Sequence, residues 1–153
     1  YDTNLKVNPP LRSRADMLAL REAVRNGQVD CIATHHQGHN YDAKVLEFEY
    51  AKFGMIGLES CFAALQTAVP GLSNEQVASL FSLNARNIFK LPDALIAEGH
   101  QAEICIYLPN ENTVFSKDKL KSKCSNSAFL DKTLTGQVIG IISRHHFILN
   151  KAI

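Results

Sequence analysis

The sequence has no excess of charge of either sign, no Cys-x-x-Cys pair and no long apolar run. Its 153 residues carry 16 Lys and Arg against 15 Asp and Glu. It therefore lacks the positive charge that neutralises phosphates, and we expect no nucleic-acid partner. No apolar stretch reaches 18 residues and no signal-peptide pattern opens the chain, so we expect neither membrane insertion nor secretion.

The cysteines argue against two further kinds of site. Cys31, Cys61, Cys105 and Cys124 are widely spaced, which excludes the paired ligands of a zinc ribbon and the motif of a thioredoxin-like enzyme. Three of them lie in apolar runs, where a free cysteine behaves as a small hydrophobic residue. We therefore expect reduced cysteines and a cytoplasmic protein.

The first third of the chain has the pattern of a strand, a helix and a second strand. Residues 4–8 form a short strand candidate that two prolines end. Residues 13–27 are predicted to be a helix, and the apolar run 29–34 a buried strand. This order favours parallel pairing through a right-handed crossover, with functional residues at the strand ends, at Asn8 and at Thr34–His39.

The middle of the chain is predicted to be helical and the end to be β-rich. Residues 73–91 give the clearest helix, because Ser73 and Gln76 have the spacing of a capping box. We assign its apolar stripe, which runs from Val77 to Phe89, to the core. The other expected elements are a mostly helical segment at 45–67, strands at 102–109 and 136–150, and loops at 109–112 and 122–127.

Three histidines, His35, His36 and His39, follow the second predicted strand. They are either structural residues or metal ligands, and a zinc site needs three or four ligands with supporting partners. Neighbouring side chains on an extended backbone point to opposite sides, so at most one of His35 and His36 can share a metal with His39. We expect no complete metal site within this chain, and we expect solvated side chains at 144–146.

The segment Asn-Pro-Pro-Leu-Arg, residues 8–12, has two interpretations. Asn8 at a strand end can present its amide to a ligand, and Arg12 can form a bidentate contact with a carboxylate. The alternative is a structural turn with an exposed arginine. These five residues alone favour the turn.

Four motifs in order resemble the C-terminal part of dihydroorotase, an enzyme of the amidohydrolase superfamily. They are LKVNPPLR at 5–12, DCIATHHQGH at 30–39, FGMIGLES at 53–60 and SNSAFLDKTLTGQVIG at 125–140. Four ordered motifs at compatible spacing are far more specific than any one of them. The resemblance covers nearly the whole chain.

The resemblance implies an α/β fold that combines part of a TIM barrel with part of a β-sandwich. It makes residues 1–95 the C-terminal segment of the barrel, with its last two strands at 4–8 and 29–34, and residues 96–153 the C-terminal part of the sandwich. A whole barrel needs about 250 residues. Because the chain also begins with Tyr1 in a sequence typical of a protein interior, we expect a fragment.

The resemblance places His35 where the family has a catalytic aspartate, since ATHHQGH replaces ATDHAPH. That aspartate ligates the family's zinc and relays a proton between the attacking water and the leaving nitrogen. A neutral imidazole lacks the negative charge that balances the metal. His35 remains a possible zinc ligand, but we expect it not to replace the aspartate in catalysis, and the family's other metal ligands match no part of this chain.

The family's substrate-binding positions are partly kept. The resemblance assigns substrate contacts to Asn8, His39 and Gly54. Lys52 replaces the proline of the family's Pro-Phe-Gly loop, two residues before that glycine, and residues 37–38 are Gln-Gly where the family has Ala-Pro. This pattern is typical of a degraded active site.

Two hypotheses about function follow from the resemblance. In the first, the protein belongs to the enzymes that interconvert dihydroorotate and N-carbamoyl aspartate in pyrimidine biosynthesis, and this chain is inactive alone. In the second, it is a pseudoenzyme that acts as a scaffold for aspartate carbamoyltransferase. Because exposed strand edges associate, we expect a homo-oligomer or an association with the missing N-terminal part.

Overall fold

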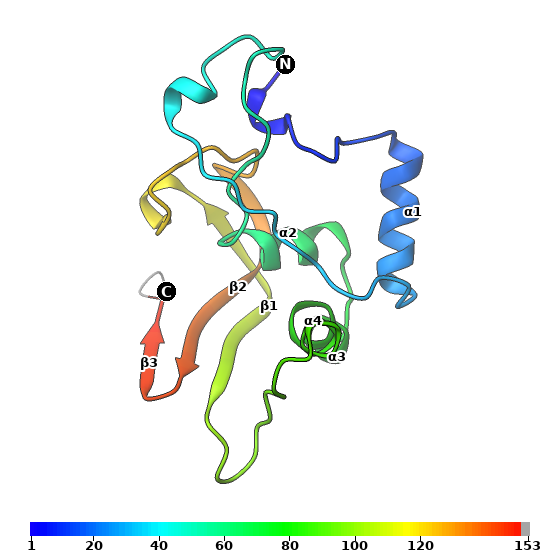
Figure 1. Ribbon diagram of the computed structural model, residues 1–153, viewed down its shortest axis with the longest axis vertical. Helices are drawn as coiled ribbons and strands as arrows, with labels where there is room; N and C mark the ends of the chain where they lie inside the picture. Colours follow the sequence, from blue (N-terminus) through cyan, green and yellow to red (C-terminus); the bar gives the residue numbers. More distant parts are fainter. Residues whose placement is uncertain (151–153) are drawn as a thin grey trace.

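The computed structural model describes residues 1–150 (Figure 1). Three helical segments and one antiparallel sheet are joined by long irregular loops. α1 stands at one side, α2 crosses the middle, and α3 and α4 lie beside the sheet. The elements are α1 (Arg14–Arg25), α2 (Cys61–Ala68), α3 (Asn74–Ala78), the π-helical η3 (Ser79–Leu83), α4 (Asn84–Phe89), β1 (Glu103–Phe115), β2 (Lys132–Ser143), β3 (His146–Leu149) and the 3₁₀ turns η1 (Thr3–Leu5), η2 (Tyr41–Ala43) and η4 (Lys117–Lys119).

The first predicted helix is confirmed as α1, and its ends follow from the sequence. The Ser13 side chain accepts a hydrogen bond from the Asp16 backbone N–H, and the Asp16 carboxylate accepts one from the Ser13 N–H at 3.0 Å. These bonds satisfy two donors that a helix start would otherwise leave unpaired. Gly27 follows the helix with a φ of 68°, a conformation that glycine adopts without strain.

The second predicted helix is confirmed as the continuous segment α3, η3 and α4, and it begins with the expected capping box at Ser73. Val77 and Leu80 are buried as predicted. The assignment of the whole stripe to the core is wrong, because Ile88 is 53% and Phe89 70% exposed. The π-helical turn changes the angle between successive side chains, so a stripe with regular helical spacing does not stay on one face.

Two predicted strands and most of a predicted helix do not form in the part of the chain that the structure describes. Residues 4–8 contain a 3₁₀ turn, and 29–34 have no regular structure. A strand is defined by a ladder with a neighbour, and no other described segment forms one with either stretch. Ile32 N–H instead donates to the carbonyl of Leu80. Within 45–67, only α2 is α-helical.

The predicted β-rich end is confirmed as a sheet of order β1-β2-β3 with antiparallel pairing. The loop expected at 109–112 is wrong, because these residues belong to β1, where the register with β2 shifts between Leu108 and Asn112. The single strand expected at 136–150 is two strands. A tight turn separates them at Arg144, whose φ is 56°. As expected, residues 144–146 are exposed.

α2 packs directly on β2. A Cβ atom at Gly136 would lie 2.9 Å from Phe62 Cε1 and 3.2 Å from Gln66 Cγ, and the φ of Gly136 is 95°. The ring of Phe62 also contacts Tyr107 on β1, with a centroid distance of 4.7 Å. Residues before and after position 95 therefore contact each other closely, and a domain boundary at that position stays a prediction.

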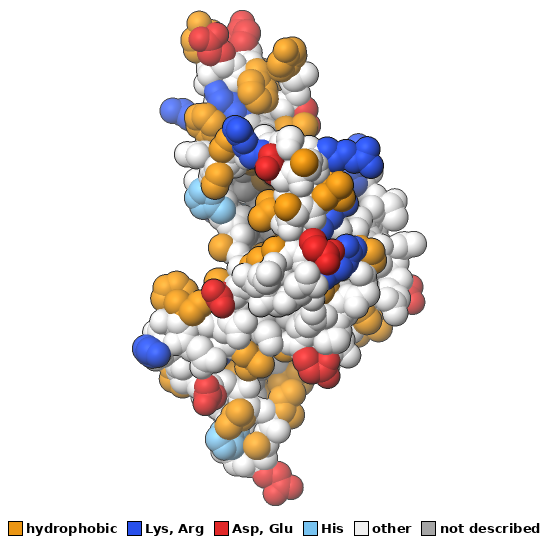
Figure 2. Space-filling model, turned by 90° about the vertical axis from the view of Figure 1, so that its right-hand side faces the viewer, with side chains coloured by type: hydrophobic (Ala, Val, Ile, Leu, Met, Phe, Trp, Pro, Cys, Tyr) orange, Lys and Arg blue, Asp and Glu red, His pale blue; other side chains and the backbone are white. Residues whose placement is uncertain are grey.

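The core is small, and apolar side chains are common on the surface. Val24, Leu65, Val69 and Leu80 form the main buried cluster. Figure 2 shows apolar side chains distributed along the whole length of one face. Among the described residues, no helix is both long and apolar enough to cross a membrane. Large exposed apolar side chains come from every part of the chain, including Leu20, Tyr41, Tyr50, Phe53, Leu58, Phe89, Phe147 and Ile148.

Candidate functional site

The segment 34–39, which carries His35, His36 and His39 and is called the histidine loop below, lies against the segment 53–58. The Gln37 N–H donates to the Met55 carbonyl at 2.9 Å. Gly57 approaches Thr34 so closely that a Cβ atom there would lie 2.9 Å from the Thr34 carbonyl oxygen. Two of the sequence motifs are thus brought together as two irregular segments in contact.

His36 is a structural acceptor. Its Nδ1 accepts hydrogen bonds from the backbone N–H groups of Gly57 and Leu58, at 3.1 and 3.2 Å. Because Nδ1 accepts, it carries no proton, and the neutral ring carries its proton on Nε2. His36 therefore fixes the chain just before α2.

His39 makes a different pair of contacts. Its backbone N–H donates to Asn126 Oδ1 at 2.9 Å, and its Nε2 lies 2.7 Å from the Phe53 carbonyl oxygen. Because a carbonyl can only accept, Nε2 carries the proton. His39 connects the histidine loop both to residues before α2 and to the distant residue 126.

His35 is exposed and has a φ of 44°, which is uncommon for a residue with a side chain. Its Nε2 lies 3.4 Å from the Gln37 amide nitrogen. The three histidines thus have separate partners, and no group of three or more His, Cys, Asp or Glu within residues 1–150 could hold a metal ion. In His36 and His39, one ring nitrogen already forms a hydrogen bond with a backbone group. This set of donors therefore does not fit zinc by itself.

Gly54 is buried at a position where only glycine fits. Its φ is 99°, and a Cβ atom would lie 2.7 Å from Gln37 Cβ. Its N–H donates to the Lys6 carbonyl at 2.8 Å. This bond brings the start of the chain to the site, where Asn8 lies exposed two residues further on. Arg12 is also exposed.

Lys44 is a buried cation that sequence reasoning missed. Its side chain is in a residue only 7% exposed, and Nζ donates to the carbonyls of Lys52 and Gly54 at 2.8 and 3.0 Å. Burial lowers the pKa of this lysine, and the negative charge of Asp2 partly opposes the shift. No carboxylate among the described residues forms an ion pair with it. Nothing in the local sequence distinguishes it from a solvated lysine.

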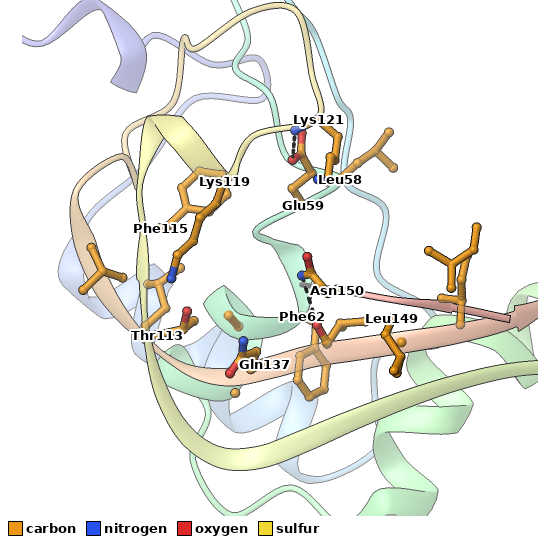
Figure 3. A pocket seen from close by; sticks show the side chains of 18 residues that line it. Leu58, Glu59, Phe62, Thr113, Phe115, Lys119, Lys121, Gln137, Leu149 and Asn150 are labelled. Carbon is orange, nitrogen blue, oxygen red and sulfur yellow. Dashed lines mark hydrogen bonds between the residues drawn. The ribbon is translucent and has the colours of Figure 1, made fainter. Parts of the chain in front are cut away.

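A separate cavity of about 660 Å³ lies between α2 and the sheet (Figure 3). Its walls are mainly apolar and include Phe62, Phe115 and Leu149. At one end, the Glu59 carboxylate accepts hydrogen bonds from the backbone N–H groups of Lys121 and Ser122 and from the Ser122 hydroxyl. Partial burial raises the pKa of Glu59, but these bonds together outweigh burial and the pKa lies below 4.5.

Comparison with known proteins identifies relatives over most of the chain. No protein-family model matches it. It is 38% identical over 141 residues to a dihydroorotase of Elusimicrobium minutum, and the match covers 90% of this chain and 33% of that protein. It is 37% identical over 145 residues to a dihydroorotase of Caldicellulosiruptor saccharolyticus, and the match covers 93% of this chain and 34% of that protein.

Solved structures of hydantoinases share the fold. A D-hydantoinase from a Thermus species superposes with a TM-score of 0.83 at 21% identity, over 96% of this chain and 34% of that chain. An L-hydantoinase from Arthrobacter aurescens gives a TM-score of 0.80 at 21% identity, over 97% and 35%. The chain spans about a third of the length of the relatives that it matches. The chain is therefore a homologue of about a third of the length of the dihydroorotases, and it shares its fold with the corresponding part of the hydantoinases.

Proposed function

We propose that this chain is a dihydroorotase-derived polypeptide that keeps substrate-facing loops of the family without its catalytic carboxylate. It does not hydrolyse dihydroorotate by itself. The observation that carries this proposal is the use of the histidine nitrogens. A ring nitrogen of His36 and one of His39 each bond a backbone group. Among the described residues 1–150, the ring of His35 bonds no backbone group.

The chemistry at position 35 supports the same proposal. A carboxylate there would bring negative charge to a divalent metal and act as a base. An imidazole brings no negative charge, and its protonated form is disfavoured beside a metal cation. A histidine that binds a metal through one nitrogen also cannot pass a proton from the same atoms. Position 35 thus supports ligand contact better than hydrolysis.

The proposed ligands are dihydroorotate and N-carbamoyl aspartate, contacted by Asn8, His39 and Gly54. His39 Nε2 already donates to the Phe53 carbonyl. To bind a ligand carboxylate, the ring therefore has to donate from Nδ1 as well, as an imidazolium does. The backbone bond between Gly54 and Lys6 holds the region of Asn8 near the same loop. Hydrogen bonds thus hold the segments of the three proposed contacts together.

We also propose that the chain functions in an assembly that completes the family fold, with residues 1–95 as barrel segment and 96–153 as sandwich segment. Its accessible surface is 10,848 Å², whereas a compact monomer of 16.9 kDa exposes about 7,700 Å². The difference of about 3,000 Å² exceeds what one subunit buries in a standard interface, about 800 Å². The remainder of the family fold, carried by the same protein or by another polypeptide, accounts for this area better than a second copy.

The test is the composition of the protein purified from cells. Light scattering with intact mass is expected to find the chain in an assembly, and elemental analysis is expected to find less than one zinc per chain. A stable monomer of 153 residues would contradict the assembly. Stoichiometric zinc on the isolated chain would contradict the loss of the metal site. Co-purification of aspartate carbamoyltransferase would instead favour the scaffold hypothesis.

A further inference from the structure

Asn126 comes from the loop between β1 and β2, far from the histidine loop in sequence. It is 7% exposed, and each polar atom of its side chain has a partner. Oδ1 accepts the His39 N–H at 2.9 Å, and Nδ2 donates to the carbonyls of Gln37 at 2.9 Å and Gly54 at 3.4 Å. One amide therefore binds two of the three segments that carry the proposed substrate contacts, those of His39 and Gly54.

The backbone of Asn126 adds to this connection. Its carbonyl accepts the Ile56 N–H at 2.9 Å, so residue 126 holds the 54–56 segment from both its side chain and its backbone. The neighbouring Cys124 limits the histidine loop as well, since a Cβ atom at Gly38 would lie 3.2 Å from its sulfur. The loop that carries Asn126 thus lies directly against the histidine loop.

An asparagine is the side chain that this geometry requires. It combines an acceptor and two donors on a short stem, whereas aspartate has no donor and serine has one hydroxyl. Burial makes the requirement stricter, because an unpaired polar group in such a place is destabilising. Lys44 supplies a second donor to the Gly54 carbonyl, but it does not contact the histidine loop through any bond that the structure describes.

We propose that Asn126 is a positioning residue that fixes His39 and Gly54 relative to each other. The inference deepens the proposed function and rests on it for the identity of the ligand. The positioning role itself depends only on the contacts of Asn126. The β-rich end of the chain then contributes directly to the geometry of the ligand site.

The experiment measures backbone amide hydrogen exchange, residue by residue, in the protein as it purifies from cells. Asn126→Ala removes the side-chain acceptor and donors and keeps the backbone bond to Ile56. Exchange at His39 is therefore expected to be about tenfold faster. Exchange at 54–56 is expected to be faster as well, and exchange in α1 is expected to stay unchanged. Asn126→Asp keeps the acceptor and the shape but loses the donors. It is expected to leave His39 protected and to speed exchange at 54–56.

Asn110→Ala is the matched control, because it removes the same amide from an exposed position of β1 and is expected to change neither segment. Unchanged protection of His39 in Asn126→Ala would overturn the proposal. Equal acceleration in α1 and in both segments would also overturn it, since that result indicates a general loss of stability. If Asn126→Ala does not fold, the Asn126→Asp pattern decides.

A second readout separates the positioning from the ligand. Calorimetric titration with N-carbamoyl aspartate is expected to show binding to the wild type and about tenfold weaker binding to Asn126→Asp. The expected exchange pattern without any binding of this probe would contradict the proposed ligand and leave the positioning role supported. Binding that is unaffected by either substitution would contradict the positioning role.

Discussion

Replacing His36 tests whether the histidine cluster is structural. In the wild type, Nδ1 of this half-buried ring accepts two backbone N–H groups from the chain just before α2. His36→Ala leaves both donors without their acceptor. His36→Asn places an amide oxygen near the position of Nδ1, so it is expected to restore most of the interaction.

The magnitude follows from the two bonds. Each hydrogen bond contributes about 0.5–1.5 kcal/mol net, so His36→Ala is expected to lower the free energy of unfolding by about 1–3 kcal/mol. His36→Asn is expected to recover at least half of that loss. The neighbouring His35 is exposed, so His35→Ala is expected to change stability by less than about 0.5 kcal/mol.

Urea denaturation of the purified protein measures all three variants against the wild type under one set of conditions. Equal losses for His35→Ala and His36→Ala would refute the reasoning, because the two side chains differ in burial and in bonding. A His36→Asn variant no better than His36→Ala would also refute it. Zinc that stabilises the wild type but not His36→Ala would show that the ring is a metal ligand.

Two further substitutions test the packing and the charge around the cavity. Gly136→Ala is expected to lower the free energy of unfolding by about 2–5 kcal/mol in urea denaturation, from positive φ and from overlap with Phe62. The control Gly71→Ala has a φ of 86° and open space, so about 1–2 kcal/mol is expected; equal losses would exclude the overlap. Because the pKa of Glu59 lies below 4.5 when folded, its stabilising contribution is present above pH 4.5 and is lost as pH falls through the folded pKa. Glu59→Gln is expected to flatten that acid limb in unfolding measurements from pH 3 to 6, and an unchanged limb would contradict the role of its bonds to Lys121 and Ser122.

Two of the three expected helical segments were predictable because their signals are local. The capping box at Ser73 forms as predicted, and Ser13 at the start of the other helix forms one with Asp16. The strands expected at 4–8 and 29–34 depend on a neighbour, which a local pattern does not contain. For the same reason, the sequence did not show that 109–112 continues β1 across a register shift.

The site residues themselves stay a prediction, and their connections could not be predicted. Sequence patterns located the histidine loop and Gly54, and the structure brings these segments into contact. Lys44 and Asn126 were missed because their partners lie 8 to 89 residues away. A buried lysine and a loop asparagine have no local signature. Only the folded chain shows that they bind backbone carbonyls.

The most direct test of the account is the hydrolysis of dihydroorotate by the protein as it purifies from cells, verified by mass to contain histidine at position 35. No turnover above background with added zinc is expected from this chain's site, because the resemblance places the imidazole of His35 at the family's catalytic carboxylate. Turnover by the wild type that is lost in His35→Ala would contradict the account, because it would show that hydrolysis requires the imidazole of His35.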